Sequence, residues 1–149
     1  MLSNKAKYGL KAMVHLARYG SQGAVVIADI ATGERIPKKF LDAILLEMKH
    51  KGFLSSKKGK GGGYSLAQPA SQILVGDLVR ILDGPLAPVP CVSRTAYQRC
   101  HDCDDESNCA VRAVMQEVRD VIARILDNTT LADMCGRVPR QEAILSYDI

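Results

Sequence analysis

The chain has 149 residues, of which 47% are hydrophobic and 24% are charged, so it can form a packed core and is not expected to be disordered. No stretch approaches the roughly 20 apolar residues of a membrane span. Lys5, Lys7 and Lys11 also interrupt any signal-peptide core. We therefore expect a cytoplasmic protein that has no membrane partner.

The net charge of +4 is unevenly divided along the chain. Residues 1–80 contain thirteen Lys and Arg against five Asp and Glu, whereas residues 81–149 contain seven against eleven. All lysines lie within the first 60 residues. This division predicts that the basic half contacts a polyanion and that the acidic half has another task. A solvated lysine face is the simpler alternative.

Three helices are predicted in the first 52 residues. The first spans residues 1–20, with Ser3 as its cap and a left-handed Gly20 as its end. The second spans residues 26–32 and ends at Gly33, and the third begins at Pro37 and ends at Gly52. The apolar stripe expected on the third helix consists of Phe40, Leu41, Ile44, Leu45 and Met48. The short turn before that helix is typical of a helix-turn-helix.

The pattern changes after residue 52. The segment KKGKGGGYSLA places lysines and glycines between two short strand-like stretches, which predicts a β-hairpin, or wing. A glycine-rich loop can also hold a nucleotide phosphate, but here no Gly-Lys-Ser/Thr ending and no helix follow it, which disfavours that function. Residues 73–82 then predict a short helix that ends at Gly84.

The second half of the chain is expected to hold a structured loop and a long helix over residues 108–126. An amphipathic stripe on that helix favours a dimer interface over packing on its own domain. The stripe consists of Val111, Val114, Met115, Val118, Val121, Ile122 and Ile125. A short helix over residues 131–135 follows. The expected fold is mainly α with a small β-hairpin wing, divided into a winged helix-turn-helix domain (1–84), a cysteine-rich sensor loop (85–107), a dimerisation helix (108–128) and a C-terminal tail (129–149).

A winged helix-turn-helix reads DNA with the second helix of its pair in the major groove and the wing on the backbone or in the minor groove. The lysines of this chain would contact phosphates or guanine acceptors, and Asp42 would accept a hydrogen bond from a cytosine amino group. The expected DNA-binding residues are Lys5, Lys7, Pro37, Lys38, Lys39, Asp42, Lys57, Lys58 and Lys60.

Four of the five cysteines, Cys91, Cys100, Cys103 and Cys109, are closely spaced, and Cys135 stands apart. An odd number of cysteines without a signal peptide argues against a disulfide framework. Soft thiolates at such spacing suit zinc or an iron–sulfur cluster. The neighbouring acids raise thiol pKa values and so disfavour a bare reactive thiolate. These acids are Asp102, Asp104, Asp105 and Glu106. Cys135 is expected to be a small buried residue.

The sequence resembles the Rrf family of bacterial winged-helix regulators, which includes IscR-, NsrR-, RirA- and CymR-type proteins. The matching segments are SNKAKYGLKAM, IPKKFLDAILLEMKHKGFL, SKKGKGGGYSLA and ILVGDLVRILDG, which cover most of residues 2–84. The resemblance implies a homodimer on a roughly palindromic operator of double-stranded DNA. It also implies that the long helix crosses to the partner subunit.

The resemblance further implies a cofactor in the cysteine loop, because many members hold a cluster on three cysteines there. Cys103 and Cys109 reproduce the spacing of the last pair, and Cys91 matches the upstream ligand at a longer gap. Arg112 stands where IscR-type proteins have a histidine ligand, and the N-terminal acidic ligand of NsrR-type proteins has no counterpart. Cys100 is the natural replacement for this missing fourth ligand and would complete a set of four sulfur ligands. We expect an iron–sulfur cluster on these four cysteines, with 2Fe–2S favoured over 4Fe–4S, and zinc as the alternative.

The sequence therefore predicts a homodimeric transcriptional regulator, acting as a repressor, whose operator binding is controlled by that cluster. A metal-independent regulator of the same fold, which uses thiol oxidation or a partner protein, is one alternative. A zinc- or cluster-binding redox protein is another. No catalytic triad, acid–base carboxylate pair or metallohydrolase motif is present, so we expect no enzyme and no catalytic residues.

Overall fold

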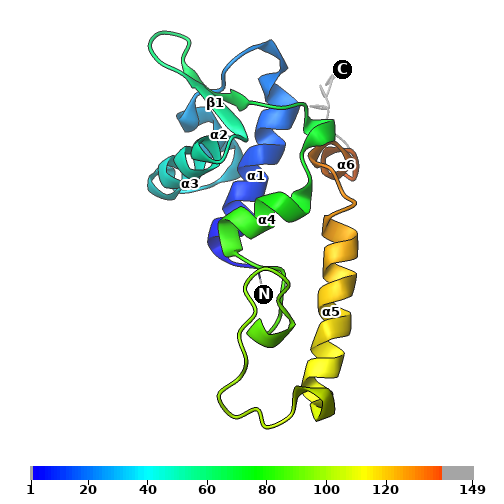
Figure 1. Ribbon diagram of the computed structural model, residues 1–149. Helices are drawn as coiled ribbons and strands as arrows, with labels where there is room; N and C mark the ends of the chain where they lie inside the picture. The colour runs from blue at the N-terminus through cyan, green and yellow to red at the C-terminus, as the bar shows by residue number, and fades with distance from the viewer. Residues whose placement is uncertain (1, 139–149) are drawn as a thin grey trace, which may run out of the picture.

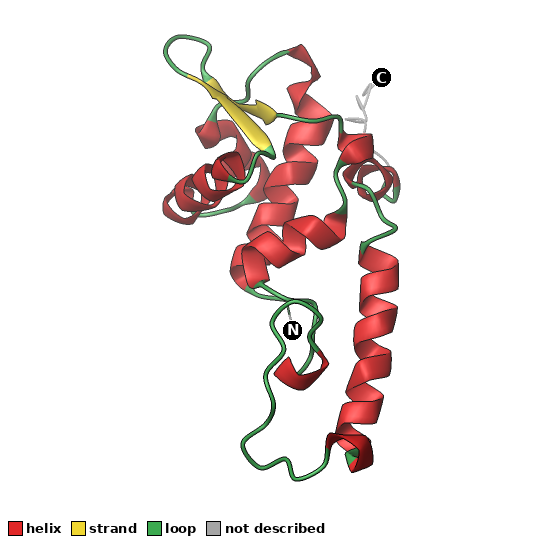
Figure 2. Ribbon diagram, in the orientation of Figure 1, coloured by secondary structure: helices red, strands yellow, loops and turns green. Residues whose placement is uncertain are grey.

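The computed structural model describes residues 2–138 and consists of a helical domain with one long helix beside it (Figure 1). Figure 2 shows the β1–β2 hairpin projecting from the otherwise helical domain. The predicted mainly helical fold with a small hairpin is confirmed. The elements are α1 (Asn4–Tyr19), α2 (Ile27–Glu34), α3 (Lys38–His50), β1 (Leu54–Lys57), β2 (Gly63–Leu66), α4 (Val75–Asp83), α5 (Ala110–Leu126) and α6 (Leu131–Gly136).

Helix α1 is the centre of the domain and contacts α2, α3, α4 and α6. Ser3 caps it as predicted, because its side chain accepts a hydrogen bond of 3.0 Å from the Ala6 N–H. The predicted left-handed end at Gly20 is wrong, since Gly20 has a φ of −87°. The chain instead tightens into a 3₁₀ turn, and the positive φ falls on Gly23 at 131°.

Helix α2 continues through Gly33, so the predicted end at that glycine is also wrong. Gly33 lies against α1, where a Cβ would stand 2.9 Å from Cε1 of the buried His15 ring. The glycine therefore allows two helices to approach each other. Arg35 takes the left-handed conformation after the helix, with a φ of 54°.

Helix α3 begins directly after Pro37, whose φ of −58° suits a helix start. Four residues of the expected stripe are buried: Leu41, Ile44, Leu45 and Met48. The fifth, Phe40, is 57% exposed, so its assignment to the core is wrong. Successive residues of an α-helix are rotated by about 100° around its axis. Phe40, the neighbour of the buried Leu41, therefore lies on the flank of the helix and not on its core face. Gly52, with a φ of 85°, follows the end of α3 as predicted.

The predicted wing is present as an antiparallel hairpin. Its register runs from Leu54 opposite Leu66 to Lys57 opposite Gly63. Tyr64 also forms an isolated bridge with Val25, which ties the returning strand to the segment before α2. The wing is thereby fixed at its base to the helix-turn-helix.

The C-terminal end of α5 is attached firmly to α4. Arg80 binds Asp127 through two hydrogen bonds, of 2.7 and 2.8 Å, and Gly76 leaves the space that Asp127 occupies. The chain then returns to the domain, where the Leu131 N–H donates to the Ile73 carbonyl and the Leu131 side chain is fully buried. Most of the residues assigned to the C-terminal tail, 139–149, lie outside the described residues.

Candidate nucleic-acid interface and cysteine pocket

The lysines of α3 and the wing form an exposed basic surface. Lys38 and Lys39 occupy the first turn of α3, and Lys38 lies 3.7 Å from Asp42 one turn later. Lys57, Lys58 and Lys60 are exposed at the end of β1 and in the turn of the hairpin. In Figure 1 the hairpin and α3 project on the same side of the domain.

The lysines of α1 lie in different surroundings. The Lys5 ammonium is 2.6 Å from the Glu47 carboxylate on α3, so this pair joins the two helices. The Lys7 ammonium lies 5.6 Å from the centre of the Tyr8 ring. Lys5 is therefore close to α3, although part of its charge is balanced by Glu47.

A pocket of about 540 Å³ lies between the starts of α1 and α3. Sequence analysis missed it, because Phe40 was assigned to the core. The sequence does place the apolar Phe40 directly after Lys39, in a turn expected to face DNA, and this pattern could have indicated the pocket. The pocket is lined by Asn4, Lys5, Tyr8, Lys39, Phe40, Ala43 and Ile44.

The four closely spaced cysteines line one pocket, of about 460 Å³, at the N-terminal end of α5. Cys91 is buried in a 3₁₀ turn, Cys100 is exposed, and Cys103 and Cys109 are half-buried. Cys109 is the N-cap of α5, and its sulfur accepts a hydrogen bond of 3.4 Å from the Arg112 N–H. Folding thus gathers thiols that are up to 18 positions apart in sequence.

The electrostatic surroundings of the pocket disfavour a free thiolate at Cys100. Desolvation, the interaction with the Cys91 thiol and the nearby charge of Asp102 together hold the pKa of the Cys100 thiol above its ordinary value. Asp105 is engaged elsewhere, because it accepts hydrogen bonds from the N–H and hydroxyl of Ser107. These bonds lower the pKa of its carboxyl.

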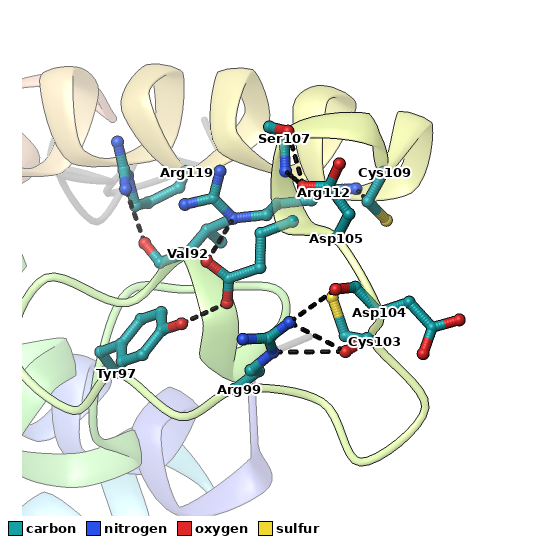
Figure 3. A network of polar contacts seen from close by, with 11 residues as sticks. Val92, Tyr97, Arg99, Cys103, Asp104, Asp105, Ser107, Cys109, Arg112 and Arg119 are labelled. Carbon is teal, nitrogen blue, oxygen red and sulfur yellow. Dashed lines mark hydrogen bonds and ion pairs between the residues drawn. The ribbon is translucent and has the colours of Figure 1, made fainter.

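A polar network that sequence analysis missed supports the loop (Figure 3). The Arg99 side chain donates to the carbonyls of Cys103 and Asp104 at 3.1 and 2.9 Å, which closes the turn of the CHDC segment. Glu106 accepts a hydrogen bond from Tyr97 and lies 4.0 Å from the Arg112 Nε. The cysteine turn and the start of α5 are therefore each held by an arginine.

The same loop is joined to the middle of α5. Arg119 donates a hydrogen bond of 2.6 Å to the Val92 carbonyl, next to Cys91. Over residues 2–138, however, no three His, Cys, Asp or Glu side chains converge on one point as metal ligands do. Cys135 lies outside the pocket, on α6, with its sulfur 4.0 Å from the Val14 carbonyl.

The helix-turn-helix, the wing and the basic surface together define a winged-helix DNA-binding protein. The chain matches the Rrf2 family, described as "Iron-dependent Transcriptional regulator", over residues 2–137, and it belongs to that family. The predicted family is confirmed. Within residues 2–138, no helix has the length and apolar character that a bilayer span requires.

Two relatives that are similar over most of the chain are named as transcriptional regulators. The chain is 44% identical to the rrf2-like HTH-type transcriptional regulator of Rhodobacter capsulatus over 137 residues, which are 90% of this chain and 91% of the relative. It is 30% identical to the regulator CymR of Bacillus subtilis over 98% of each chain. The family and these relatives are transcriptional regulators and not enzymes, as expected, and this chain is a DNA-binding transcriptional regulator of the same family.

Solved structures agree with this assignment. CymR, the global cysteine regulator of B. subtilis, superposes with a TM-score of 0.77 at 28% identity and covers 93% of this chain and 98% of its own. IscR of T. potens gives a TM-score of 0.75 at 26% identity, over 99% of this chain and 94% of its own.

Proposed function

We propose that this regulator is a homodimeric repressor, acting in the cytoplasm, whose operator binding is controlled by an iron–sulfur cluster on Cys91, Cys100, Cys103 and Cys109. The observation that carries the proposal is the common pocket of these four thiols at the start of α5. Their chemistry fits the group, because soft thiolates are the usual ligands of such clusters. We favour 2Fe–2S over 4Fe–4S, and zinc is the alternative.

The bound cluster supplies a centre that responds to redox state or to iron supply. The chain's own contribution is to connect the pocket to the DNA-binding domain. Cys109 begins α5, and Asp127 follows its last residue and is held by Arg80 on α4. A movement of the cysteine loop at Cys109 would therefore change the position of the N-terminal end of α5, while Arg80 and Asp127 hold its C-terminal end on α4. A ligand that favours one arrangement of this helix then shifts DNA affinity.

A second copy of the chain is the partner that we propose for α5. Its aliphatic stripe is 36% to 63% exposed in the single subunit, at Val111, Val114, Val118, Val121, Ile122 and Ile125. Burial of such a stripe is favourable and would pair two subunits along their long helices. Two recognition helices could then occupy successive major grooves, about 34 Å apart.

Anaerobic reconstitution tests the cofactor. We expect a coloured protein with visible absorption bands and equal molar amounts of iron and sulfide. Its affinity for a DNA duplex that it selects from a random library should differ from that of the cofactor-free protein. A colourless product that retains stoichiometric zinc would overturn the cluster assignment.

A metal-independent regulator is the second candidate, because the thiols of Cys91 and Cys100 line the same pocket. Two adjacent thiols can be oxidised to a disulfide when a peroxide accepts their electrons and protons. The discriminating variant replaces Cys103 and Cys109 with Ala. The cluster model predicts that regulation is lost in this variant, whereas the thiol model predicts that it is retained.

A further inference from the structure

Phe40 is an exposed aromatic residue on the helix that reads DNA. It is one of only two phenylalanines in the chain, and 57% of it is accessible in the first turn of α3. Exposure of a large apolar side chain is unfavourable in water, so a partner that covers it gains from the contact. The first turn of a recognition helix is the part that approaches base edges.

The pocket beside Phe40 has an apolar interior and a cationic rim. Phe40, Tyr8, Ala43 and Ile44 supply its carbon surface. Phe40, Ala43 and Glu47 follow one flank of α3, and the ion pair between Glu47 and Lys5 holds α1 against that flank. The pocket is therefore built by two helices that are joined to each other.

The rim charge identifies the kind of partner. Lys39 lines the pocket and is exposed, and over residues 2–138 no ion pair neutralises it. The preceding residue, Lys38, adds a positive charge at the same helix start, which Asp42 balances in part at 3.7 Å. An apolar surface beside the unpaired charge of Lys39 suits a polyanion that also presents an apolar group, whereas a neutral apolar ligand would not interact with that charge.

Duplex DNA presents one such group in its major groove, the 5-methyl group of thymine. We infer that the pocket between α1 and α3 receives the methyl group of a thymine in the operator, and that Phe40 thereby determines part of the sequence specificity. The inference rests on the DNA-binding function and adds the base that this surface selects. Lys39 then contacts the neighbouring phosphate or guanine.

The test replaces single thymines of the selected duplex with deoxyuridine, which removes only the methyl group. Burial of one methyl group corresponds to about a fourfold change in affinity. We expect one thymine in each half-site to show this loss with the wild-type protein. Phe40→Ala should bind the original duplex more weakly by a similar factor and should no longer distinguish thymine from uracil at that position.

Leu46→Ala is the matched control, because Leu46 is a 45% exposed apolar residue of α3 that does not line the pocket. It should keep the thymine preference, and Phe40→Leu should keep most of it. If every uracil substitution is neutral, or if Phe40→Ala retains the preference, the inference is wrong although DNA binding stands. If no duplex is selected at all, the DNA-binding function itself fails.

Discussion

The four pocket cysteines differ from the fifth in their surroundings, and this difference can be tested residue by residue. Cys91, Cys100, Cys103 and Cys109 line one pocket, whereas Cys135 packs on α6 against α1. A thiol that is a ligand cannot be replaced without loss of the cofactor, but a thiol that only fills space can.

We therefore expect each of the four pocket cysteines, when changed to Ala, to lower the iron and sulfide retained after reconstitution by at least half. Cys135→Ala should retain the wild-type amount and serves as the control for thiol removal. The measurement is metal and sulfide analysis beside the visible spectrum. Equal retention in all five variants would contradict the assignment of the pocket as a cofactor site.

A second residue-level prediction concerns Asp127. The hydrogen bonds from Arg80 lower the pKa of the Asp127 carboxyl, and the pair is about one third exposed. Because of this exposure, we expect Asp127→Asn to reduce the free energy of unfolding by only about 1 kcal/mol. Chemical denaturation at several pH values measures the effect.

The sign of its pH dependence follows from the direction of the shift. A carboxyl whose pKa is lowered by folding stabilises the native state above its unfolded pKa of about 3.9, and this stabilisation is lost as the pH falls through the folded value. The difference in the free energy of unfolding between wild type and Asp127→Asn should be constant above about pH 5 and should shrink below about pH 4. A difference that grows in acid would show that Arg80 does not hold the charged carboxylate.

At the level of elements, local rules predicted the helices and the wing but not every role of a glycine or an apolar residue. Hydrophobic periodicity predicted α3 correctly, because four of the apolar residues in the expected stripe face the core. It could not show that Phe40, one residue from the stripe, lies on the flank beside α1. That position depends on the crossing of two helices.

The glycines show the same limit. A glycine near a helix end suggests a stop at a positive φ, and Gly52 and Gly84 both have a positive φ after their helices. This rule fails for Gly33, which is needed for the contact with His15. For the cysteines, spacing alone indicated a shared site, and they do line one pocket. Sequence could not reveal that Arg99 closes their turn through backbone carbonyls.

Gly76 permits the junction between α4 and α5, and this leads to an element-level prediction. A Cβ at this position would overlap the Asp127 carboxylate and come within 3.0 Å of the Arg80 Nη1. Gly76→Ala should therefore destabilise the protein by about 1–3 kcal/mol, measured by thermal or chemical unfolding. Gly20→Ala is the control, since a Cβ there meets nothing within 4 Å, and should change stability by less than about 0.5 kcal/mol. Equal effects of the two substitutions would contradict a close-packed junction.

For the whole molecule, the number of phosphate contacts connects the basic surface to the oligomeric state. Each subunit offers Lys38, Lys39, Lys57, Lys58 and Lys60 on α3 and the wing. A dimer would then make at most about ten such contacts. Because each contact releases counterions, the slope of log affinity against log salt concentration should be no steeper than about −9.

Separation of the subunits should halve that limit. Val118 lies in the middle of the exposed stripe of α5, and Val118→Asp places a charge in the proposed interface, where it would be desolvated. We expect this variant to sediment as a monomer and to bind the selected duplex with a salt slope no steeper than about −4.5. Glu117→Gln, one residue away on α5 and outside the stripe, should remain dimeric with the wild-type slope. If Val118→Asp stays dimeric, or becomes monomeric with an unchanged slope, then α5 does not determine how many lysine surfaces reach the DNA.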